Sequence, residues 1–241
     1  MSGVGSMLGL RDLRCGTHAC LLYESEAEHQ AVVTEFIELG LERSEKLIYV
    51  RDAHSAQTIE SYLAEHLDIR AYISRGQLHI MSFADAYMYG STFDPERMIR
   101  LVRNETEIAV AEGWSGLRTS VEMTWVLKRW PGSNELAAYE SRSNSFYGGS
   151  RCIALCQYDC RNLNPALLLH ALSTHPVAAI GQRVYENPFY RAPVPTAGRG
   201  SNAALLKRRL KELRDVSEVV ETRARSARSS SCGFSIRPTW E

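Results

Sequence analysis

The side chains best suited to chemistry in this chain directly follow short apolar runs. They form four groups: Tyr23 with Glu24; Arg51, Asp52 and His54; Glu122 with Trp125; and Gln157, Tyr158 and Asp159. In an open parallel sheet, ligands bind at the carboxyl ends of the strands. Aromatic walls with a few polar anchors are typical of a small-molecule pocket, although strand ends are also polar without a ligand. The pattern predicts a small-molecule site at one edge of a parallel sheet.

Two carboxylates, Glu122 and Glu140, suggest a second chemistry. Close together they could perform general acid–base catalysis, and each has an arginine nearby in sequence, Arg118 and Arg142. Arg118 and Glu122 are four residues apart on a predicted strand, so their side chains lie on the same face. We therefore expect an internal ion pair rather than a catalytic pair.

Motifs of common enzyme classes are absent from the sequence. It contains no Gly-x-Ser-x-Gly, His-Glu-x-x-His or Gly-x-Gly-x-x-Gly motif. None of the four lysines follows a glycine, so the Gly-Lys-Ser/Thr of a phosphate-binding loop is missing. We expect no enzymatic activity and no cofactor.

Cysteines and histidines form a third candidate group. Cys152, Cys156 and Cys160 recur every four residues, and His18 begins the first predicted strand. On a strand, residues four apart lie roughly 13 Å from one another, which is too far to share one ion. Free cysteine also behaves as a small buried hydrophobe. We predict no metal site, and His18 is either a pocket residue or a hydrogen-bonded core histidine. A thiol- or metal-based redox sensor built on these four residues is an alternative.

An alternation of strands and helices must position these groups. Apolar runs predict strands at residues 18–23, 46–50, 78–82, 117–123, 152–158 and 177–180. Helices are predicted from residues 25, 56, 94, 133 and 164, with a capping box at Ser25 and Glu28 and Pro95 at a first helical position. This alternation predicts an α/β three-layer sandwich with a mostly parallel central sheet.

Length and composition fit one domain with a tail. The 241 residues include 28 Lys and Arg, 28 Asp and Glu, and 44% hydrophobic residues. Zero net charge removes any global electrostatic reason to bind nucleic acid or a membrane surface. The apolar runs fall far short of the roughly 18 residues of a membrane span, and six cysteines are too few for a disulfide scaffold. We therefore expect a cytoplasmic protein.

Composition divides the chain into five segments. They are a disordered lead-in (1–14), the folded domain (15–190), a Pro- and Gly-rich linker (191–202), a basic amphipathic helix (203–226) and a disordered tail (227–241). In the helix, apolar positions alternate at spacings of four and three, as in a short coiled-coil seam: Leu206, Leu210, Leu213, Ser217 and Val220. We expect a homodimer or partner contact here rather than nucleic-acid binding.

Seven segments together resemble the MEDS family, the methanogen/methylotroph sensory domain of regulators such as the dichloromethane-responsive repressor. They are residues 16–24, 93–96, 113–118, 122–125, 139–140, 152–159 and 175–176, within a resemblance that spans roughly 13–180. The resemblance implies a fold similar to the RecA/KaiC-type ATPase core without its phosphate loop. It also implies a sensor of small organic ligands joined to a signalling output. No helix-turn-helix precedes Cys15 and no kinase core follows Val220, so this output is expected to differ.

The resemblance carries over twelve pocket or signature positions: His18, Tyr23, Glu24, Arg118, Glu122, Trp125, Tyr139, Glu140, Cys156, Gln157, Tyr158 and Asp159. We predict a sensor that binds a small organic ligand and relays occupancy through its C-terminal helix to a regulatory protein. Membrane or direct nucleic-acid binding is not expected. The alternative is a degenerate RecA-like nucleotide-binding protein or ATPase. It would use Glu122 or Glu140 as base and Arg118 in place of the missing lysine.

Overall fold

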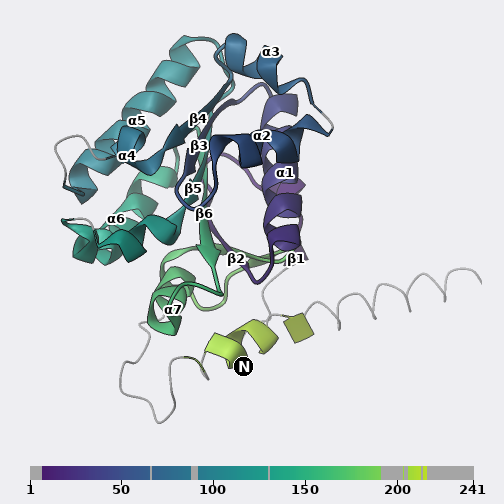
Figure 1. Ribbon diagram of the computed structural model, residues 1–241. Helices are drawn as coiled ribbons and strands as arrows, with labels where there is room; N and C mark the ends of the chain where they lie inside the picture. The colour runs from purple at the N-terminus through teal and green to yellow at the C-terminus, as the bar shows by residue number, and fades with distance from the viewer. Residues whose placement is uncertain are drawn as a thin grey trace, which may run out of the picture.

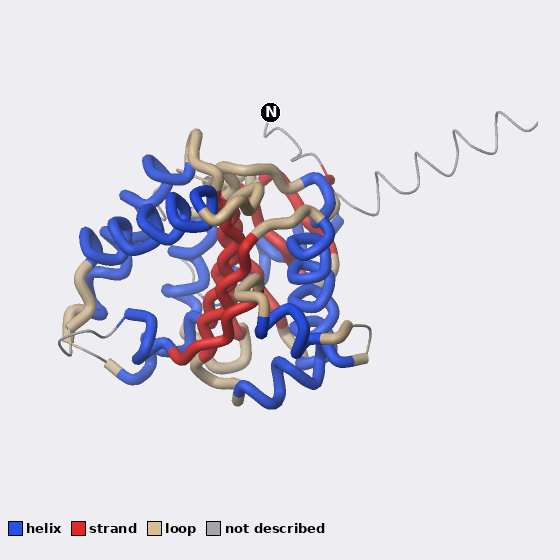
Figure 2. Tube along the Cα trace, turned by 90° about the horizontal axis from the view of Figure 1, so that it is seen from above, coloured by secondary structure: helices blue, strands red, loops and turns tan. Residues whose placement is uncertain are grey.

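The fold is a three-layer α/β sandwich, as predicted. The computed structural model describes residues 7–65, 67–87, 92–129, 131–190, 203, 206–212 and 214–215. A central sheet has α1, α2 and α3 on one side and α4, α5 and α6 on the other (Figure 1). Seen from above, the strands form the middle layer between two layers of helices (Figure 2).

Within the described residues the sheet has eight strands in the order β1-β8-β7-β2-β6-β5-β3-β4. All pairs from β7 through to β4 are parallel, whereas β8 pairs antiparallel with both β7 and β1. The carboxyl ends of β2, β6, β5 and β3 therefore lie side by side. The strands are Met7–Leu8 (β1), His18–Tyr23 (β2), Lys46–Arg51 (β3), Leu78–Ser82 (β4), Leu117–Glu122 (β5), Cys152–Asp159 (β6), Val177–Ile180 (β7) and Arg183–Glu186 (β8).

Several helices begin where a side chain caps their free N–H groups, although α6 begins without such a cap. Ser25 accepts a hydrogen bond from the Glu28 N–H, Asp94 from the Arg97 N–H and Asn164 from the Leu167 N–H, at three predicted helix starts. The helices are Glu26–Glu42 (α1), Ala56–Ala64 (α2), Ile69–Ser74 (α3), Phe83–Tyr87 (α4), Pro95–Ala111 (α5), Leu136–Tyr147 (α6) and Pro165–Thr174 (α7). Short 3₁₀ turns are Leu10–Asp12 (η1), Met123–Lys128 (η2) and Ser133–Glu135 (η3).

Each central strand buries side chains on both faces of the sheet. In β6, Leu155 packs toward α1, whereas Cys156 faces the opposite helical layer. The two faces carry separate hydrophobic cores, as expected when helices cover both faces of a parallel sheet. Alternate strand residues therefore belong to different sites.

Part of the N-terminal segment 1–14, which we expect to be disordered, belongs to the fold. Met7 and Leu8 pair with β8, and Leu10 and Leu13 are buried in the core on the α1 side. A two-residue strand followed by isolated leucines carries no period, so the sequence pattern could not reveal it. Residues 1–6 lie outside the described residues.

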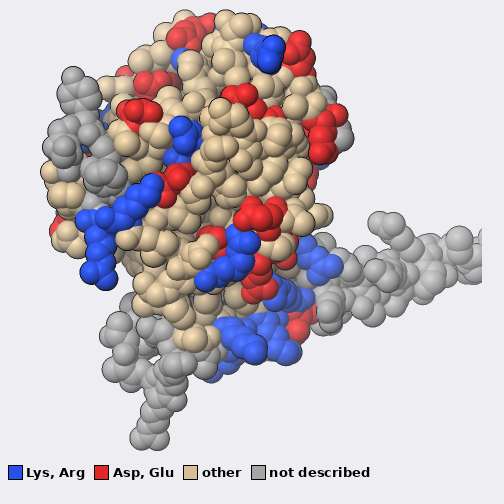
Figure 3. All heavy atoms as spheres, in the orientation of Figure 1, with Lys and Arg blue, Asp and Glu red and all other residues tan. Residues whose placement is uncertain are grey.

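The predicted C-terminal helix is helical at residues 203, 206–212 and 214–215. Leu206 and Leu210 do not form a free seam, because both are buried in the same core as α6 and α7. Arg209 lies over the Phe189 ring, 4.5 Å from its centroid. Basic side chains gather over this segment at the lower edge of Figure 3. The expected linker (191–202), the rest of the predicted helix and the tail (227–241) lie outside the described residues.

None of the helices in the described part of the chain combines the length and the apolarity that a membrane span requires.

Candidate functional site

The predicted polar rim at the strand ends is organised around Glu122, the last residue of β5. Its side chain is 1% exposed, and its Oε2 accepts hydrogen bonds from the backbone N–H groups of Asp52, Ala53 and His54 at 2.8, 2.6 and 3.1 Å. Its Oε1 accepts from the Tyr49 hydroxyl at 2.8 Å and lies 3.0 Å from His54 Nδ1. The loop after β3 therefore closes over this carboxylate.

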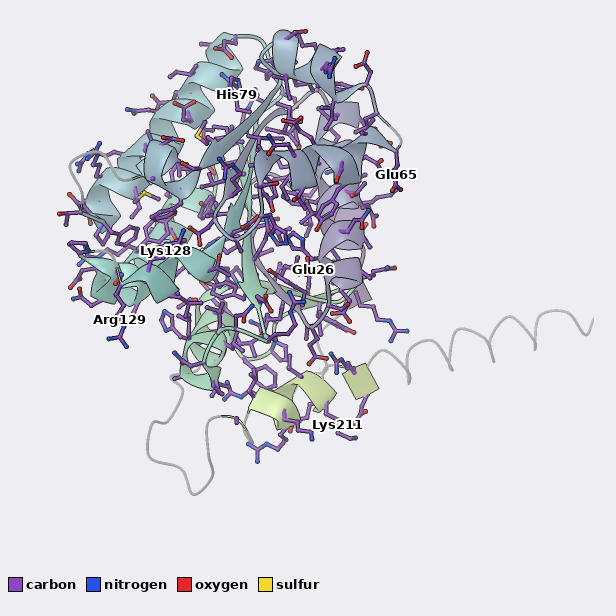
Figure 4. The ribbon with its side chains drawn as sticks, in the orientation of Figure 1. Glu26, Glu65, His79, Lys128, Arg129 and Lys211 are labelled. Carbon is purple, nitrogen blue, oxygen red and sulfur yellow. The ribbon has the colours of Figure 1, made fainter. Side chains whose placement is uncertain are left out.

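The network continues toward β6 and α1. The His29 ring stacks on the His54 ring, with centroids 4.4 Å apart, and its Nε2 lies 2.6 Å from Gln157 Oε1. The Gln157 amide donates in turn to Ser120 Oγ at 2.7 Å. From the other side, Lys128 (labelled in Figure 4) donates to Asp52 Oδ1 at 2.6 Å. The loop is thus fixed by hydrogen bonds on both sides.

Opposite charges alternate through this rim. The hydrogen bond to Glu122 raises the pKa of His54 to about 9 against the opposing effect of burial, and Glu26 adds to the rise. Burial alone would raise the pKa of Glu122, but the bonds from His54 and the backbone hold it below its ordinary range. Glu26, labelled in Figure 4, lies 2.6 Å from Arg161 and 2.9 Å from His54, and these partners lower its pKa to about 2. The charged side chains Glu122, His54, Glu26 and Arg161 thus pair with one another, whereas His29 Nδ1 and Arg51 Nε are buried without a hydrogen-bond partner among the described residues.

We expect the stability that His54 contributes to be lost as pH rises. Its folded-state pKa of about 9 exceeds its ordinary value of 6.5. The contribution is therefore fully present below about pH 6.5 and disappears as pH passes about 9. Glu122 and Glu26 stabilise the protonated form of His54, whereas the stacked His29 ring opposes it. The Tyr62 ring also faces His54, in an edge-on arrangement. After allowance for solvent screening, the effect is about 1–2 kcal/mol.

Thermal denaturation of the wild type and of His54→Gln, from about pH 6 to pH 10, measures this contribution. The difference in Tm should be largest at the acid end and should shrink through pH 9. A difference that does not change with pH would contradict the protonated state of His54.

A second group of predicted residues lies on the opposite face of the sheet, around Glu140 of α6. Glu140 Oε2 lies 3.3 Å from His18 Nε2 and 3.3 Å from His175 Nε2. Cys156 Sγ lies 3.5 Å from His18 Nε2, and the Tyr158 hydroxyl donates to Glu140 Oε1 at 3.1 Å. We call His18, Glu140, Cys156 and His175 the Glu140 cluster; none of the four is more than 5% exposed.

The expected ion pair between Arg118 and Glu122 is wrong, and the alternative pairing of Glu122 with Glu140 does not form either. Glu122 and Glu140 lie on opposite faces of the sheet, so they cannot act as a catalytic carboxylate pair. Arg118 does not reach Glu122, because four strand residues separate their Cα atoms by roughly 13 Å. Arg118 instead pairs with Glu45, at 2.5 Å between Nε and Oε2, and its guanidinium lies over the Phe36 ring.

The remaining predicted residues have local roles. Trp125 is 1% exposed and stacks on Phe83, and Tyr139 packs edge-on against Phe93. The others serve the strand-end network: Tyr23 packs on His29, Asp159 pairs with Arg161, and Glu24 pairs with Arg214. Cys152 and Cys160 lie outside the Glu140 cluster, and burial raises the pKa of each thiol to about 12. Reactive thiols need a lowered pKa, so these two do not support a redox sensor.

Several site residues carried little sequence signal. His29 lies one turn into α1 and has the position of an ordinary helical residue, and Tyr49 lies inside an apolar run. His175 stands out only as part of the short segment 175–176 of the family resemblance. The hydrogen-bond partner of Tyr49, Glu122, is more than 70 residues away in sequence. The partner of His29, Gln157, is more than 120 residues away.

A cavity of about 350 Å³ lies between β3, β4 and the helices α4 and α5. None of the twelve predicted site residues lines it. Most of its wall is apolar, and its polar groups include Lys46, Thr119 and His79, which is labelled in Figure 4. The apolar lining residues are Ile48, Val50, Met81, Ala86, Leu101, Val102 and Leu117. Its size and composition suit a small, mostly apolar molecule.

The chain is thus a three-layer α/β protein with a mostly parallel sheet and a cavity of small-molecule size. It belongs to the MEDS family, because the model of the MEthanogen/methylotroph, DcmR Sensory domain matches residues 17–176. The predicted family is therefore confirmed, and with it a sensory role.

The solved structures similar to this chain include the following two. One is the KaiC-like protein PH0186 from Pyrococcus horikoshii OT3, with 12% identity, a TM-score of 0.49 and coverage of 69% of this chain and 71% of that one. The other is the flagellar accessory protein FlaH from Methanocaldococcus jannaschii, with 12% identity, a TM-score of 0.47 and coverage of 70% and 72%. No curated protein matches the sequence.

Proposed function

We propose that this protein senses a small, mostly apolar organic molecule, which it binds in the cavity between β3, β4, α4 and α5. The cavity carries the proposal, because its volume lies within the range of small-molecule sites and its wall is largely apolar. Lys46, His79, Glu105 and Thr119 supply a few polar groups that would orient a ligand. The polar rim at the strand ends then stabilises the fold rather than holding the ligand.

The packing supports a route from the cavity to the C-terminal segment. Val50, Val102 and Leu117 line the cavity and belong to the same hydrophobic core as Leu206 and Leu210. Close-packed cores transmit changes in volume because they contain few voids. A ligand that fills the cavity would therefore alter the surface against which the C-terminal helix packs. This helix would report occupancy to a regulatory partner.

The structure favours this function over nucleotide binding. The chain passes from β2 to α1 through Glu24 and Ser25 alone, and Ser25 caps the helix N-terminus. Glu26 and Glu28 add negative charge where a phosphate would have to lie. Arg118, the predicted substitute for the missing lysine, is buried with Glu45 near the amino end of β5.

A thermal-shift screen tests the proposal. The purified chain is titrated with one-carbon, halogenated and aromatic compounds and, separately, with nucleotides plus magnesium. A ligand at one hundred times its dissociation constant adds about 2.7 kcal/mol, which raises the Tm by several degrees. We expect such a rise with an organic compound. A rise with magnesium nucleotides alone would overturn the proposal.

A further inference from the structure

The Glu140 cluster brings together four ligand atoms from different parts of the fold. His18 begins β2, Glu140 lies in α6, Cys156 lies in β6 and His175 follows α7. Their nearest nitrogen, oxygen and sulfur atoms all lie within 4.8 Å of one another, and three of the separations are 3.3, 3.3 and 3.5 Å. Ligands about 2.0–2.3 Å from a tetrahedral ion lie about 3.3–3.8 Å apart. These three separations therefore fit the edges of a tetrahedral coordination shell.

Both imidazoles are oriented by their other nitrogen. His175 Nδ1 lies 2.8 Å from the Ala171 carbonyl, which can only accept, so Nδ1 carries the proton. His18 Nδ1 faces Asn144 Oδ1 at 3.1 Å, and the Asn144 amide nitrogen donates to the Thr174 carbonyl at 2.7 Å. Such bonds fix the tautomer of metal-binding histidines. In the neutral rings, each Nε2 then points a lone pair toward Glu140.

Two polar atoms at the centre of the cluster have no partner. Within the described residues, His175 Nε2 and Glu140 Oε2 are buried without a hydrogen-bond partner. An unpartnered buried polar atom is costly, and facing lone pairs repel one another. A proton on one histidine would satisfy a single contact with Glu140, whereas a divalent cation would satisfy all four ligand atoms.

We propose that His18, Glu140, Cys156 and His175 bind one divalent transition-metal ion, with zinc(II) favoured. Two imidazoles, one thiolate and one carboxylate form a donor set that suits zinc, and the two anionic ligands neutralise its charge in the buried site. The ion displaces the Cys156 thiol proton to solvent as the metal–sulfur bond forms. With all four positions taken by protein, the ion ties β2, β6, α6 and the start of β7 together. This inference is independent of the proposed ligand cavity.

Cobalt(II) is the probe that tests the site, because it is visible spectroscopically in zinc sites. The full chain is produced in cobalt-supplemented medium, and its metal content and absorption spectrum are measured. We expect one equivalent of cobalt, the strong visible bands of tetrahedral coordination and a thiolate-to-cobalt charge-transfer band. Zinc should displace the cobalt and remove the spectrum. A wild-type protein without stoichiometric cobalt or zinc would overturn the proposal whatever the variants do.

Matched cysteine variants identify the sulfur ligand. Cys156→Ser should abolish the charge-transfer band, whereas Cys160→Ser, at the half-buried neighbouring cysteine on the same chain segment, should keep it. Glu140→Gln retains the shape of the side chain and should weaken cobalt binding at least tenfold. A band that survives in Cys156→Ser and is lost in Cys160→Ser would contradict the assignment.

Discussion

Replacing Glu45 with Ala is expected to lower the free energy of unfolding by about 3–5 kcal/mol, because it leaves the charge of Arg118 buried without a partner. Arg118 is 1% exposed, and its Nε lies 2.5 Å from Glu45 Oε2. The guanidinium passes beside Gly40, where a Cβ would lie 2.7 Å from Arg118 Cδ. Arg118 therefore packs closely against α1 and is buried from solvent.

Chemical denaturation measures this effect, with Glu42→Ala as the matched control. Glu42, the last residue of α1 and three residues before Glu45, pairs with Arg11 at 3.4 Å on the surface, so its loss should cost less than about 1 kcal/mol. The double variant Glu45→Ala, Arg118→Met removes the buried charge and should recover most of the loss. If Glu45→Ala costs no more than Glu42→Ala, the buried pair has been assigned wrongly.

Trp125→Ala is the second substitution expected to have a large effect, about 3–5 kcal/mol of unfolding free energy. The indole is 1% exposed, stacks on Phe83 at 4.2 Å between ring centroids and lies 4.9 Å from Phe93. Its removal leaves a cavity beside α4 and the segment that precedes α5. The sequence predicted Trp125 as a pocket residue, whereas its packing is that of a core residue.

Urea denaturation of Trp125→Ala and Leu127→Ala checks this prediction. Leu127 lies in the same 3₁₀ turn but is 49% exposed, so its loss should change stability by less than about 0.5 kcal/mol. Equal losses in the two variants would contradict the core role of Trp125.

The elements that could be predicted from sequence are those with local signals. Capping side chains at Ser25, Asp94 and Asn164 start helices within their own first turn, and apolar runs of five to eight residues are sufficient to indicate the central strands. The two-residue β1 has no such signal, and the short helices α3 and α4 are capped by Asp68 and Ser82 but have only six and five residues. They form because the rest of the fold provides their partners.

The candidate site could be predicted only in part. Sequence position places Glu122 at a strand end, but its partners follow β3, about 70 residues earlier, and become neighbours only through the order β6-β5-β3. Glu140 and His18 likewise come from different elements, α6 and β2, and become neighbours only in the folded chain. The cavity is harder to predict from sequence than either network, because its lining residues, such as Val50, Ala86 and Val102, have the sequence character of ordinary core residues.

The most direct test of a sensory cavity is the thermal-shift titration performed on three proteins. Ala86 lines the cavity, whereas Ala84 is exposed on the same helix, so Ala86→Phe and Ala84→Phe add the same ring inside and outside it. An organic compound should raise the Tm of the wild type and of Ala84→Phe by several degrees and that of Ala86→Phe by less than about one degree. Equal rises in all three proteins would contradict binding in this cavity.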